Sequence, residues 1–554
     1  MTDMGADAGA GAGTAPGAGP GPADTGPSAG AGAGPGPGPG GTGPSAGAGP
    51  GPAGGLRGPL ILAVDQGTSA TKAVLTDPEG TVLASGAAPL AAAYPRPGWV
   101  EQSAEEVWRS VTEAVRGCLA GHDPAAVAAV GLSTQRESVL LWDRATGEPV
   151  GPLLGWQDRR TADDCARLLA DGAGPGVRAA TGLPLDPMFS ALKAKWLLDT
   201  YDPARTRARR GELCLGTVDS WLLWRLGGGA DHVIEVGNAA RTQLLDIRRR
   251  DWDEDLLGLF GVPRAALPRV VASTGPFPAV RGVAPLVDGT PVGAVLGDSH
   301  AALLGHGVFA PGRVKATYGT GSSVMGLVAS PDAAGAGDAL CLTVAWDDSG
   351  TDGGAPAYAL EGNIRSSGAT LRWLAGLLGR TEAELAASAA PDSGGVHLVP
   401  AFGGLAAPWW DNDATALISG LTLGTGAPEL ARAALESIAF QVEDVVAAVD
   451  RAGDPVAVVL ADGGPSGNAA LMRLQADLSG RTVACPRVGG LSAVGAAQLA
   501  ARTLGLIGRE RLAALARDAE VYRPTLPEPE RLRRRAAWHD AVARSRNARK
   551  VPSS

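Results

Sequence analysis

A glycine-containing turn, Asp65–Ser69 (DQGTS), combines several groups that could bind phosphate. In such a turn the backbone N–H groups point toward phosphate oxygens. The hydroxyls of Thr68 and Ser69 add hydrogen-bond donors, and Lys72 adds a positive charge. Asp65 ends an apolar, strand-like run and is suited to hold Mg²⁺ through water. An ordinary hairpin tip has the same composition, so this turn alone does not identify a phosphate site.

Two further glycine turns could complete a nucleotide site. Tyr318–Ser322 (YGTGS) repeats the Gly-Thr pair between two strand-like runs, which hints at internal duplication. Asp462–Asn468 (DGGPSGN) lies between an apolar strand and a helix, and a helix N-terminus can bind phosphate or ribose. Because the chain contains 81 glycines, chance matches to such turns are expected. The pattern fits a nucleotide site and also fits unrelated hairpins.

Polar residues that follow strand-like runs could act on a polyol. Asp298 comes just after the run Val292–Leu296, and a carboxylate at a strand end suits a general base for a substrate hydroxyl. The N-cap of a helix is an equally common role for such an aspartate. Arg136 and Glu137 could donate to and accept from vicinal hydroxyls, or could be ordinary surface neighbours. Trp156 could cover the apolar face of a polyol or belong to the core.

Strand and helix patterns surround these turns. A three-strand meander and a counterpart in the second half are predicted at residues 59–64, 71–76, 81–85, 313–317 and 324–328. Apolar spacing predicts helices at residues 104–120, 428–449, 492–506 and about 510–546. Ser103 is the expected N-cap of the first helix. The third helix is rich in alanine and glycine, which suits close packing.

Composition excludes several classes of protein. The chain has 554 residues, 45% of them hydrophobic, and a net charge of −9, which argues against a nucleic-acid binder. No apolar run reaches the length of a membrane span. The five cysteines and six histidines are dispersed, without the spacing of a metal site. We therefore expect a cytoplasmic protein with reduced thiols and no metal cage built by the protein alone.

Residues 1–57 form a segment unlike the rest of the chain. They consist almost entirely of Gly, Ala, Pro, Ser and Thr, which cannot bury enough apolar surface to offset the entropy of ordering. The segment also lacks the basic start and apolar stretch of a signal peptide. We expect it to be a disordered tail outside the fold.

Taken in order, a series of segments resembles the FGGY family of carbohydrate kinases, and within it the glycerol kinases. The matching segments are VDQGTSATKAV, YPRPGWVEQ, GLSTQRES, WQDRRTA, GLPLDPMFSALKAKWLLD and GTVDSWLLWRL in the first half, and GDSHAALLGHG, KATYGTGSSVM, YALEGNIRSSGATLRWL, PAFGGLAAPWWD, ALESIAFQVEDV and DGGPSGNAALMRLQAD in the second. The likeness runs from about Leu60 to about Arg546. It implies an α/β fold of two actin-like (ribonuclease H-like) domains, at residues 58–305 and 306–554, with ATP bound between them.

The resemblance also implies roles for individual residues. Asp298 resembles the catalytic base, and Asp65 resembles the magnesium-associated aspartate. The residues that match nucleotide-binding positions are Thr68, Ser69, Lys72, Thr320, Gly368, Arg372, Gly464 and Asn468. The residues that match acceptor-binding positions are Arg136, Glu137, Trp156, Met188, Asp298 and Ser299.

Four residues depart from what the family's glycerol kinases have. Met188 replaces a tyrosine, Ser299 a glutamine, Ser323 a phenylalanine and Lys72 an arginine. The tyrosine and glutamine would bond substrate hydroxyls, and the phenylalanine would pack against the carbon chain. Ser323 therefore implies a larger and wetter acceptor pocket, whereas Lys72 keeps the charge of the arginine without its forked geometry.

The activity implied by the resemblance is transfer of phosphate from ATP, with Mg²⁺, to a terminal hydroxyl of glycerol or a related small polyol. The altered pocket leaves two alternatives open: a kinase for another sugar or polyol, such as a tetritol, pentitol or ketopentose, and a catalytically inactive sensor. The expected partners are these small molecules rather than nucleic acid or a membrane. Members of the family often form dimers or tetramers.

Overall fold

The structure is a computed structural model that describes residues 58–332, 339–453 and 455–547. The prediction of a disordered tail at residues 1–57 lies outside this described part. Within the described residues, no helix is both long and apolar enough to cross a membrane.

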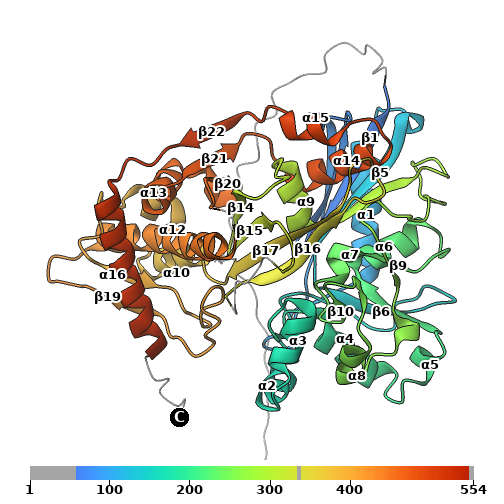
Figure 1. The fold of residues 1–554 in the computed structure, drawn as a ribbon, viewed down its shortest axis with the longest axis horizontal. Coiled ribbons are helices and arrows are strands. Elements are labelled where there is room, and N and C mark those ends of the chain that lie inside the picture. The colour runs from blue at the N-terminus through green and yellow to red at the C-terminus, as the bar shows by residue number, and fades with distance from the viewer. Residues whose placement is uncertain (1–57, 333–338, 454, 548–554) are drawn as a thin grey trace, which may run out of the picture. The chain divides into compact units, whose positions relative to one another are not determined.

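A five-stranded sheet forms the core of the first half (Figure 1). β1 (Leu60–Gln66) pairs antiparallel with β2 (Ala70–Thr76), which pairs antiparallel with β3 (Val82–Pro89), as the predicted meander requires. β5 (Val127–Thr134) and β13 (Val292–Gly297) continue the sheet in parallel beyond β1. Side chains from both faces of β1 belong to apolar clusters, which explains why the strand reads as an unbroken hydrophobic run.

The helix α1 (Ala104–Cys118) covers one face of this sheet, against β2 and β3. Its buried side chains recur at helical spacing, for example Val107, Val111 and Ala114. The hydroxyl of Ser103 accepts a hydrogen bond from the backbone N–H of Glu106 at 3.3 Å. The N-cap predicted from the sequence is therefore confirmed.

A seven-stranded sheet forms the core of the second half, in the order β16-β17-β15-β14-β20-β21-β22. Its strands are β14 (Arg313–Tyr318), β15 (Ser322–Val328), β16 (Cys341–Asp347), β17 (Pro356–Ile364), β20 (Val458–Asp462), β21 (Thr482–Pro486) and β22 (Ala519–Tyr522). The run β17-β15-β14-β20-β21 repeats the order and strand directions of β3-β2-β1-β5-β13. This repeat supports the internal duplication suggested by the two Gly-Thr turns.

Two helices lie between the sheets (Figure 1). α9 (Asp298–Gly305) follows β13, and α14 (Leu491–Thr503) packs against α9 and the five-stranded sheet. A Cβ atom on Gly495 would lie 1.9 Å from the carbonyl oxygen of Ala301, so only glycine allows this approach. The close packing predicted for this helix is therefore confirmed, and it joins the two halves through one apolar cluster.

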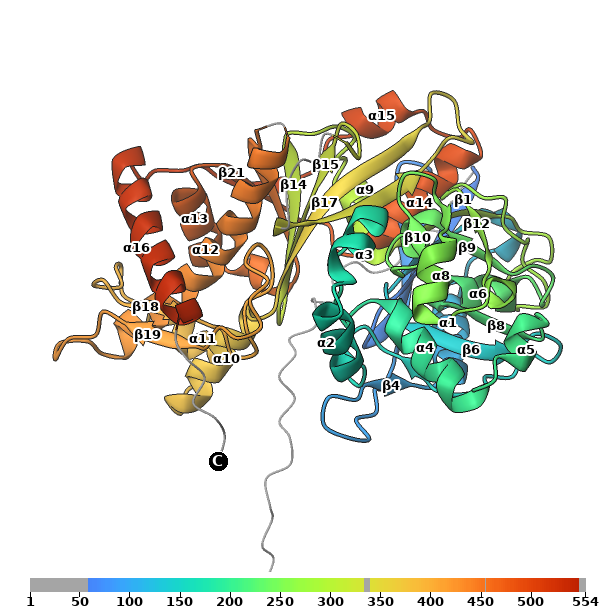
Figure 2. The same cartoon turned by 60° about the horizontal axis from the view of Figure 1, so that its bottom comes forward.

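The other side of the seven-stranded sheet carries α12 (Ala427–Ala452), α13 (Ala469–Ser479) and α16 (Glu528–Asn547), as Figure 2 shows. α10 (Gly368–Leu377) packs on α12. α12 matches the helix predicted at residues 428–449 within a few residues. The single helix predicted at about residues 510–546 is wrong over its first half, because the chain leaves α15 (Arg509–Ala514) and pairs β22 with β21 before α16 begins at Glu528.

A four-stranded sheet, in the order β4-β7-β6-β8, lies beside the five-stranded sheet in the first half. Its strands are β4 (Glu101–Gln102), β6 (Val139–Asp143), β7 (Leu153–Leu154) and β8 (Leu213–Thr217). The remaining helices and strands are α2 (Ala162–Ala170), α3 (Gly174–Thr181), α4 (Ser190–Tyr201), α5 (Thr206–Arg209), α6 (Val218–Leu226), β9 (Val233–Glu235), α7 (Val236–Ala239), β10 (Leu245–Asp246), β11 (Asp251–Trp252), α8 (Glu254–Phe260), β12 (Arg269–Val271), α11 (Glu382–Ala387), β18 (His397–Val399), β19 (Leu417–Ser419) and α15 (Arg509–Ala514).

Candidate active site

Asp298 is the first residue of α9, and Gly297 takes the N-cap position. The alternative that Asp298 is itself an N-cap is therefore wrong. Its Oδ1 accepts a hydrogen bond from the backbone N–H of Ser299 at 2.6 Å and lies 3.3 Å from Nε of Arg136. Burial raises the pKa of Asp298, Arg136 opposes that shift, and Glu137 adds to it. Because the side chain is 39% exposed, it can meet a ligand.

Arg136 and Glu137 are buried, at 7% and 5% exposure, so they are not surface neighbours. They also do not pair with each other. Arg136 donates two hydrogen bonds to Glu361, at 3.1 and 2.6 Å, and Glu137 accepts one from Nε of Arg241 at 2.7 Å. Glu137 has a positive φ of 62°, which turns the chain directly after β5.

Glu361, on β17, joins these pairs into one network. It is fully buried, and its Oε2 lies 2.8 Å from Nη2 of Arg241. Ser323 donates a further hydrogen bond to Oε1 at 3.0 Å. Burial tends to raise the pKa of Glu361, but Arg136 and Arg241 outweigh it and hold the pKa well below the usual range. The network Glu137–Arg241–Glu361–Arg136–Asp298 therefore alternates in charge from end to end.

Asp65 lies at the same sheet edge as Asp298. The carboxyl ends of the parallel strands β1, β5 and β13 meet there, with Asp65 opposite Ser133 in the register. The hydroxyl of Ser133 donates to Oδ1 of Asp65 at 2.8 Å. Burial raises the pKa of Asp65 to about 6, Ser133 opposes the shift, Asp298 adds to it, and Lys72 opposes it. The sequence predicted both carboxylates, and the fold brings them together.

The turn after β1 contacts Trp156. The indole Nε1 of Trp156 donates to Oγ1 of Thr68 at 3.0 Å. Trp156 is 37% exposed, so it is not a core tryptophan. Ser69 and Lys72 are exposed on the same turn and the strand that follows it.

The glycine residues predicted for the nucleotide converge at one edge of the seven-stranded sheet. The backbone N–H of Gly368 donates to the carbonyl oxygen of Gly319 at 2.9 Å, and a Cβ atom on Gly368 would lie 2.7 Å from that oxygen. The same Cβ atom would lie 3.8 Å from Cγ of Pro465, next to Gly464. The exposed Thr320 is on this edge, since its carbonyl oxygen accepts a hydrogen bond from Ser367 N–H at 2.9 Å.

Asn468 and Arg372 have partners of their own at this edge. Oδ1 of Asn468 accepts hydrogen bonds from Ala470 N–H and Leu471 N–H, at 3.0 and 3.1 Å, and so caps α13. Arg372 lies one turn into α10, is 64% exposed, and pairs with Glu382 at 2.9 Å. Its side chain is therefore already engaged away from the glycine turns.

Met188 and Ser299 are the two remaining residues that match acceptor-binding positions. Both are half-buried. Met188 packs with Trp410 against a small cluster that includes Phe189 and Cys341. Ser299 follows Asp298 in the first turn of α9.

Several residues of the site gave no recognised signal in the sequence. Glu361 lies within a segment that resembles the family and Arg241 lies outside all of those segments, and no local pattern indicates a role for either. Lys315, on β14, is fully buried, and burial lowers its pKa. His306, just after α9, lies 2.7 Å from Oδ2 of Asp462. Each is recognisable only once the elements around it are placed.

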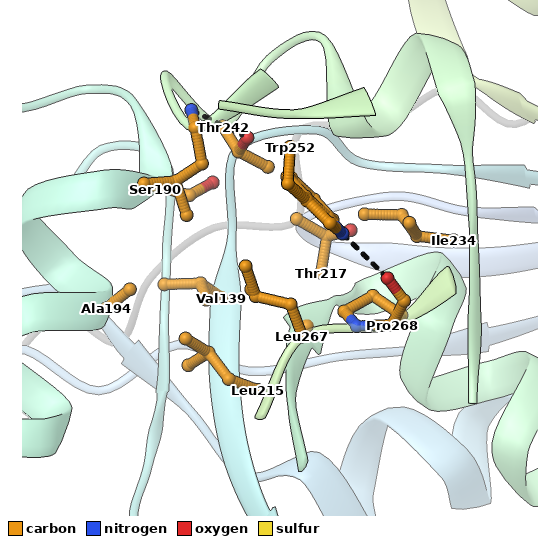
Figure 3. Close-up of a pocket in the computed structure, with 12 residues that line it drawn as sticks. Val139, Ser190, Ala194, Leu215, Thr217, Ile234, Thr242, Trp252, Leu267 and Pro268 are labelled. Carbon is orange, nitrogen blue, oxygen red and sulfur yellow. Dashed lines mark hydrogen bonds between the residues drawn. The ribbon is translucent and has the colours of Figure 1, made fainter. Parts of the chain in front are cut away.

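Figure 3 shows a cavity whose lining contains no charged residue. Its lining includes Ser190, Thr217 and Thr242, whose hydroxyls donate to Glu137, Asp219 and Ala239. Figure 3 also shows Trp252, whose indole donates to the carbonyl oxygen of Pro268 at 2.8 Å. With its polar groups already paired, the cavity belongs to the core.

Among the described residues no three His, Cys, Asp or Glu side chains form a metal-binding group.

Comparison with known proteins gives a consistent result. The N-terminal domain of the FGGY family of carbohydrate kinases matches residues 60–305, and its C-terminal domain matches residues 314–504. A glycerol kinase of Aromatoleum aromaticum is 45% identical over 499 residues, covering 88% of this chain and 98% of the relative. An apulose kinase of Pectobacterium atrosepticum is 42% identical over 496 residues, covering 88% and 98%. The crystal structure of Plasmodium falciparum glycerol kinase with ADP superposes with a TM-score of 0.81 at 27% identity, covering 88% and 98%. The two-domain α/β fold predicted from the sequence is therefore confirmed.

Proposed function

The chain belongs to the FGGY family of carbohydrate kinases, and we propose that it transfers the γ-phosphoryl group of ATP to a terminal hydroxyl of glycerol or a related small polyol. The observation that carries this proposal is the position of Asp298. Its partly exposed carboxylate lies 3.3 Å from Arg136, at the sheet edge where Asp65 also ends its strand. A base, a hydroxyl-binding cation and a phosphate-binding turn are thus adjacent.

Asp298 acts as the general base in this proposal. Burial raises its pKa, which makes it a better proton acceptor than an ordinary carboxylate. It takes the proton of the terminal hydroxyl as that oxygen attacks the γ-phosphorus in line. Phosphoryl transfer depends mainly on positioning and charge neutralisation, so a single base suffices.

The acceptor lies among Arg136, Glu137, Trp156, Met188 and Ser299. Arg136 donates to substrate hydroxyls and Glu137 accepts from them, while both keep their buried partners. Trp156 covers the carbon chain. The ion pairs on Glu361 fix the Arg136 side chain, so its free N–H groups are held ready for the substrate.

The nucleotide lies against the three glycine turns. Thr68, Ser69, Lys72 and Thr320 supply donors and charge for the phosphates, and Gly368, Arg372, Gly464 and Asn468 border the nucleoside. Asp65 fits Mg²⁺, because that ion uses one or two carboxylates and takes its other ligands from phosphate oxygens and water. The ion would neutralise charge on the β- and γ-phosphates.

A kinase for a larger sugar is the second candidate. The hydroxyl of Ser323 donates to Glu361, which is bonded to Arg136. The small serine occupies a position where a larger side chain would reduce the space for the acceptor. The 42% identity with an apulose kinase supports the same direction. An inactive sensor is less consistent with the presence of both Asp65 and Asp298.

An acceptor screen tests the proposal. Release of ADP and formation of the phosphorylated product are measured with glycerol, tetritols, pentitols and ketopentoses, using the wild type and Asp298→Ala. We expect at least one acceptor to give product with the wild type, and a loss of about 10³-fold in kcat for the variant, since general base catalysis contributes roughly 10²–10⁴. Nucleotide binding to the variant should persist.

The outcomes separate the candidates. The highest kcat/KM with glycerol supports the first proposal, and a sugar that exceeds glycerol supports the second. Product formation by Asp298→Ala at the wild-type rate would remove the base assignment. If no acceptor raises ADP release above that of the variant, the chain is not a polyol kinase.

A further inference from the structure

Five residues from four segments of the first half form a closed ring of hydrogen bonds. Thr68 lies in the turn after β1, and Gln102 is the second residue of β4. Gln135 follows β5, Ser138 precedes β6, and Trp156 comes just after β7. We call Thr68, Gln102, Gln135, Ser138 and Trp156 the amide ring.

Each bond of the amide ring has ordinary hydrogen-bond length. Nε2 of Gln102 donates to the carbonyl oxygen of Thr68 at 2.8 Å. Nε2 of Gln135 donates to Oε1 of Gln102 at 3.1 Å, and Ser138 donates to Oε1 of Gln135 at 2.9 Å. The backbone N–H of Trp156 donates to Oγ of Ser138 at 3.0 Å, and its indole closes the ring on Oγ1 of Thr68 at 3.0 Å. Thr68 therefore takes part in the ring through two groups, its carbonyl oxygen and its hydroxyl.

The three residues that connect the ends are buried. Gln102, Gln135 and Ser138 are exposed by 4%, 1% and 0%, so water cannot replace a broken bond without opening the structure. A buried amide that loses a partner incurs a cost of desolvation, so breaking one bond of the ring weakens the others. Its two ends, Thr68 and Trp156, are the only members with marked exposure: Thr68 is half-buried and Trp156 is 37% exposed.

The ring also fixes the direction of the Thr68 hydroxyl. A threonine hydroxyl has one O–H to donate and two lone pairs. Because the Trp156 indole can only donate, Oγ1 of Thr68 must accept at that contact, and its own O–H is left for another acceptor. A phosphate oxygen at the turn is such an acceptor.

We propose that Gln102, Gln135 and Ser138 are positioning residues that couple acceptor binding at Trp156 to phosphate binding at Thr68. This inference rests on the proposed function, which puts the acceptor on Trp156 and the phosphates on the turn. A bound acceptor restrains the Trp156 indole, and the restrained indole orients the Thr68 hydroxyl for the nucleotide. In the reverse direction, a bound nucleotide restrains Thr68, which orients the indole for the acceptor. Such coupling is reciprocal, so each ligand tightens the other by the same factor.

The test measures that factor in variants that touch neither ligand. Binding of the β,γ-imido analogue of ATP is measured by calorimetry without and with saturating acceptor, the acceptor being the one with the highest kcat/KM in the screen. Gln102→Met and Ser138→Ala open the ring at opposite sides. Gln498→Met is the matched control, because Gln498 is 3% exposed and also donates to a backbone carbonyl, that of Glu79, at 2.8 Å.

We expect the acceptor to tighten nucleotide binding about fivefold or more in the wild type and in Gln498→Met, which is the lower end of usual coupling factors. In Gln102→Met and Ser138→Ala the factor should fall below about twofold, with binary acceptor affinity changed less. The KM for ATP measured with saturating acceptor should rise accordingly, while kcat stays closer to the wild type.

Different failures have different meanings. If the wild-type factor is one, or if either ring variant keeps the wild-type factor, the inference is overturned while the proposed function stands. If Gln498→Met loses the factor as the ring variants do, the effect is one of general stability and the inference is again overturned. If the screen finds no acceptor, the proposed function fails and the inference fails with it. If Gln102→Met does not fold, Ser138→Ala alone decides.

Discussion

Asp298 lies next to buried charged side chains, whereas the close contacts of Gly368 are mainly with backbone atoms. Arg136, Arg241 and Glu361 are all at most 7% exposed and bond one another through charged groups. At Gly368 the close contacts are with the carbonyl oxygen of Gly319 and the ring of Pro465. The two sides of the proposed active site therefore depend on different forces.

This difference predicts which substitutions each side of the site tolerates. A buried charge that loses its partner is costly, because water cannot replace that partner. A backbone contact is insensitive to charge but sensitive to a single added carbon atom. The acceptor side should therefore respond to changes that preserve shape and remove charge, and the nucleotide side to changes that preserve charge and add volume.

The largest effect is expected for Glu361→Gln, which keeps the shape and removes the charge. Arg136 and Arg241 would both lose a buried anion, and breaking a buried pair costs about 3–5 kcal/mol of stability. Urea unfolding measures the loss. Glu382→Gln is the control, because its pair with Arg372 is exposed and should cost about 1 kcal/mol or less. Equal losses in the two variants would contradict the comparison.

The next effect is expected for Gly368→Ala, which adds one carbon to the nucleotide side. The new Cβ atom would lie 2.7 Å from the carbonyl oxygen of Gly319, so the turn must shift. A displacement of this kind is expected to raise the KM for ATP about 10-fold to 100-fold, with less change in the KM for the acceptor. Steady-state kinetics with both substrates varied measures it.

Gly376→Ala is the matched control on the same helix. A Cβ atom there would have no atom within 4 Å. Replacing an unrestricted helical glycine by alanine adds about 0.5–1 kcal/mol of stability. Unchanged KM values with a slightly raised melting temperature are expected, and a raised KM for ATP in this variant would show that any change in α10 disturbs the nucleotide.

The same contrast explains what the sequence could predict. The turns after β1 and β14, the cap at Ser103 and the long helices depend on local composition and spacing, so their residues carried the signal. The hydrogen bonds between Arg136 and Glu361 join residues 225 positions apart, and no local pattern specifies such a pair. From sequence, Arg136 and Glu137 could be ordinary surface neighbours, whereas in the fold both are buried and each has a distant partner.

The direction in which a side chain points is the second feature that the sequence could not predict. Arg372 matches a nucleotide-binding position, yet whether it faces the nucleotide depends on where Glu382 lies. Trp156 could have been a core residue, and its exposure became known only once β7 and the turn after β1 were placed. Residue types thus predicted which chemical groups are available, whereas the fold determines which of these groups contact one another.

A smaller effect concerns pH and the buried Lys315. Asp298 faces Arg136, Glu137, Lys315 and, across the sheet edge, Asp65, and Lys315 works to lower its pKa. A base must be deprotonated, so kcat/KM falls about tenfold per pH unit below that pKa. Lys315→Met should shift this acid limb to higher pH, with little effect at pH 8.

An exposed lysine elsewhere in the chain provides the control for this pH profile. Lys195→Met removes an exposed lysine paired with Asp199 and should leave the limb in place. Stability responds in the opposite sense to activity: a carboxyl group with a raised pKa binds more protons when folded, so its contribution falls as pH rises from the unfolded to the folded pKa. A limb that moves to lower pH in Lys315→Met would contradict the assignment.

The smallest effect is expected for Arg372→Ala. Its side chain is 64% exposed and pairs with Glu382, and an exposed pair contributes only about 0–1 kcal/mol. We expect the KM for ATP to change less than about threefold, because the charge is already engaged away from the glycine turns. Glu382→Gln alone should behave in the same way, since either change opens the same pair. If Arg372→Ala instead raised the KM for ATP tenfold while Glu382→Gln did not, the arginine would leave Glu382 for the nucleotide, and a charge as well as the backbone would hold that side of the site.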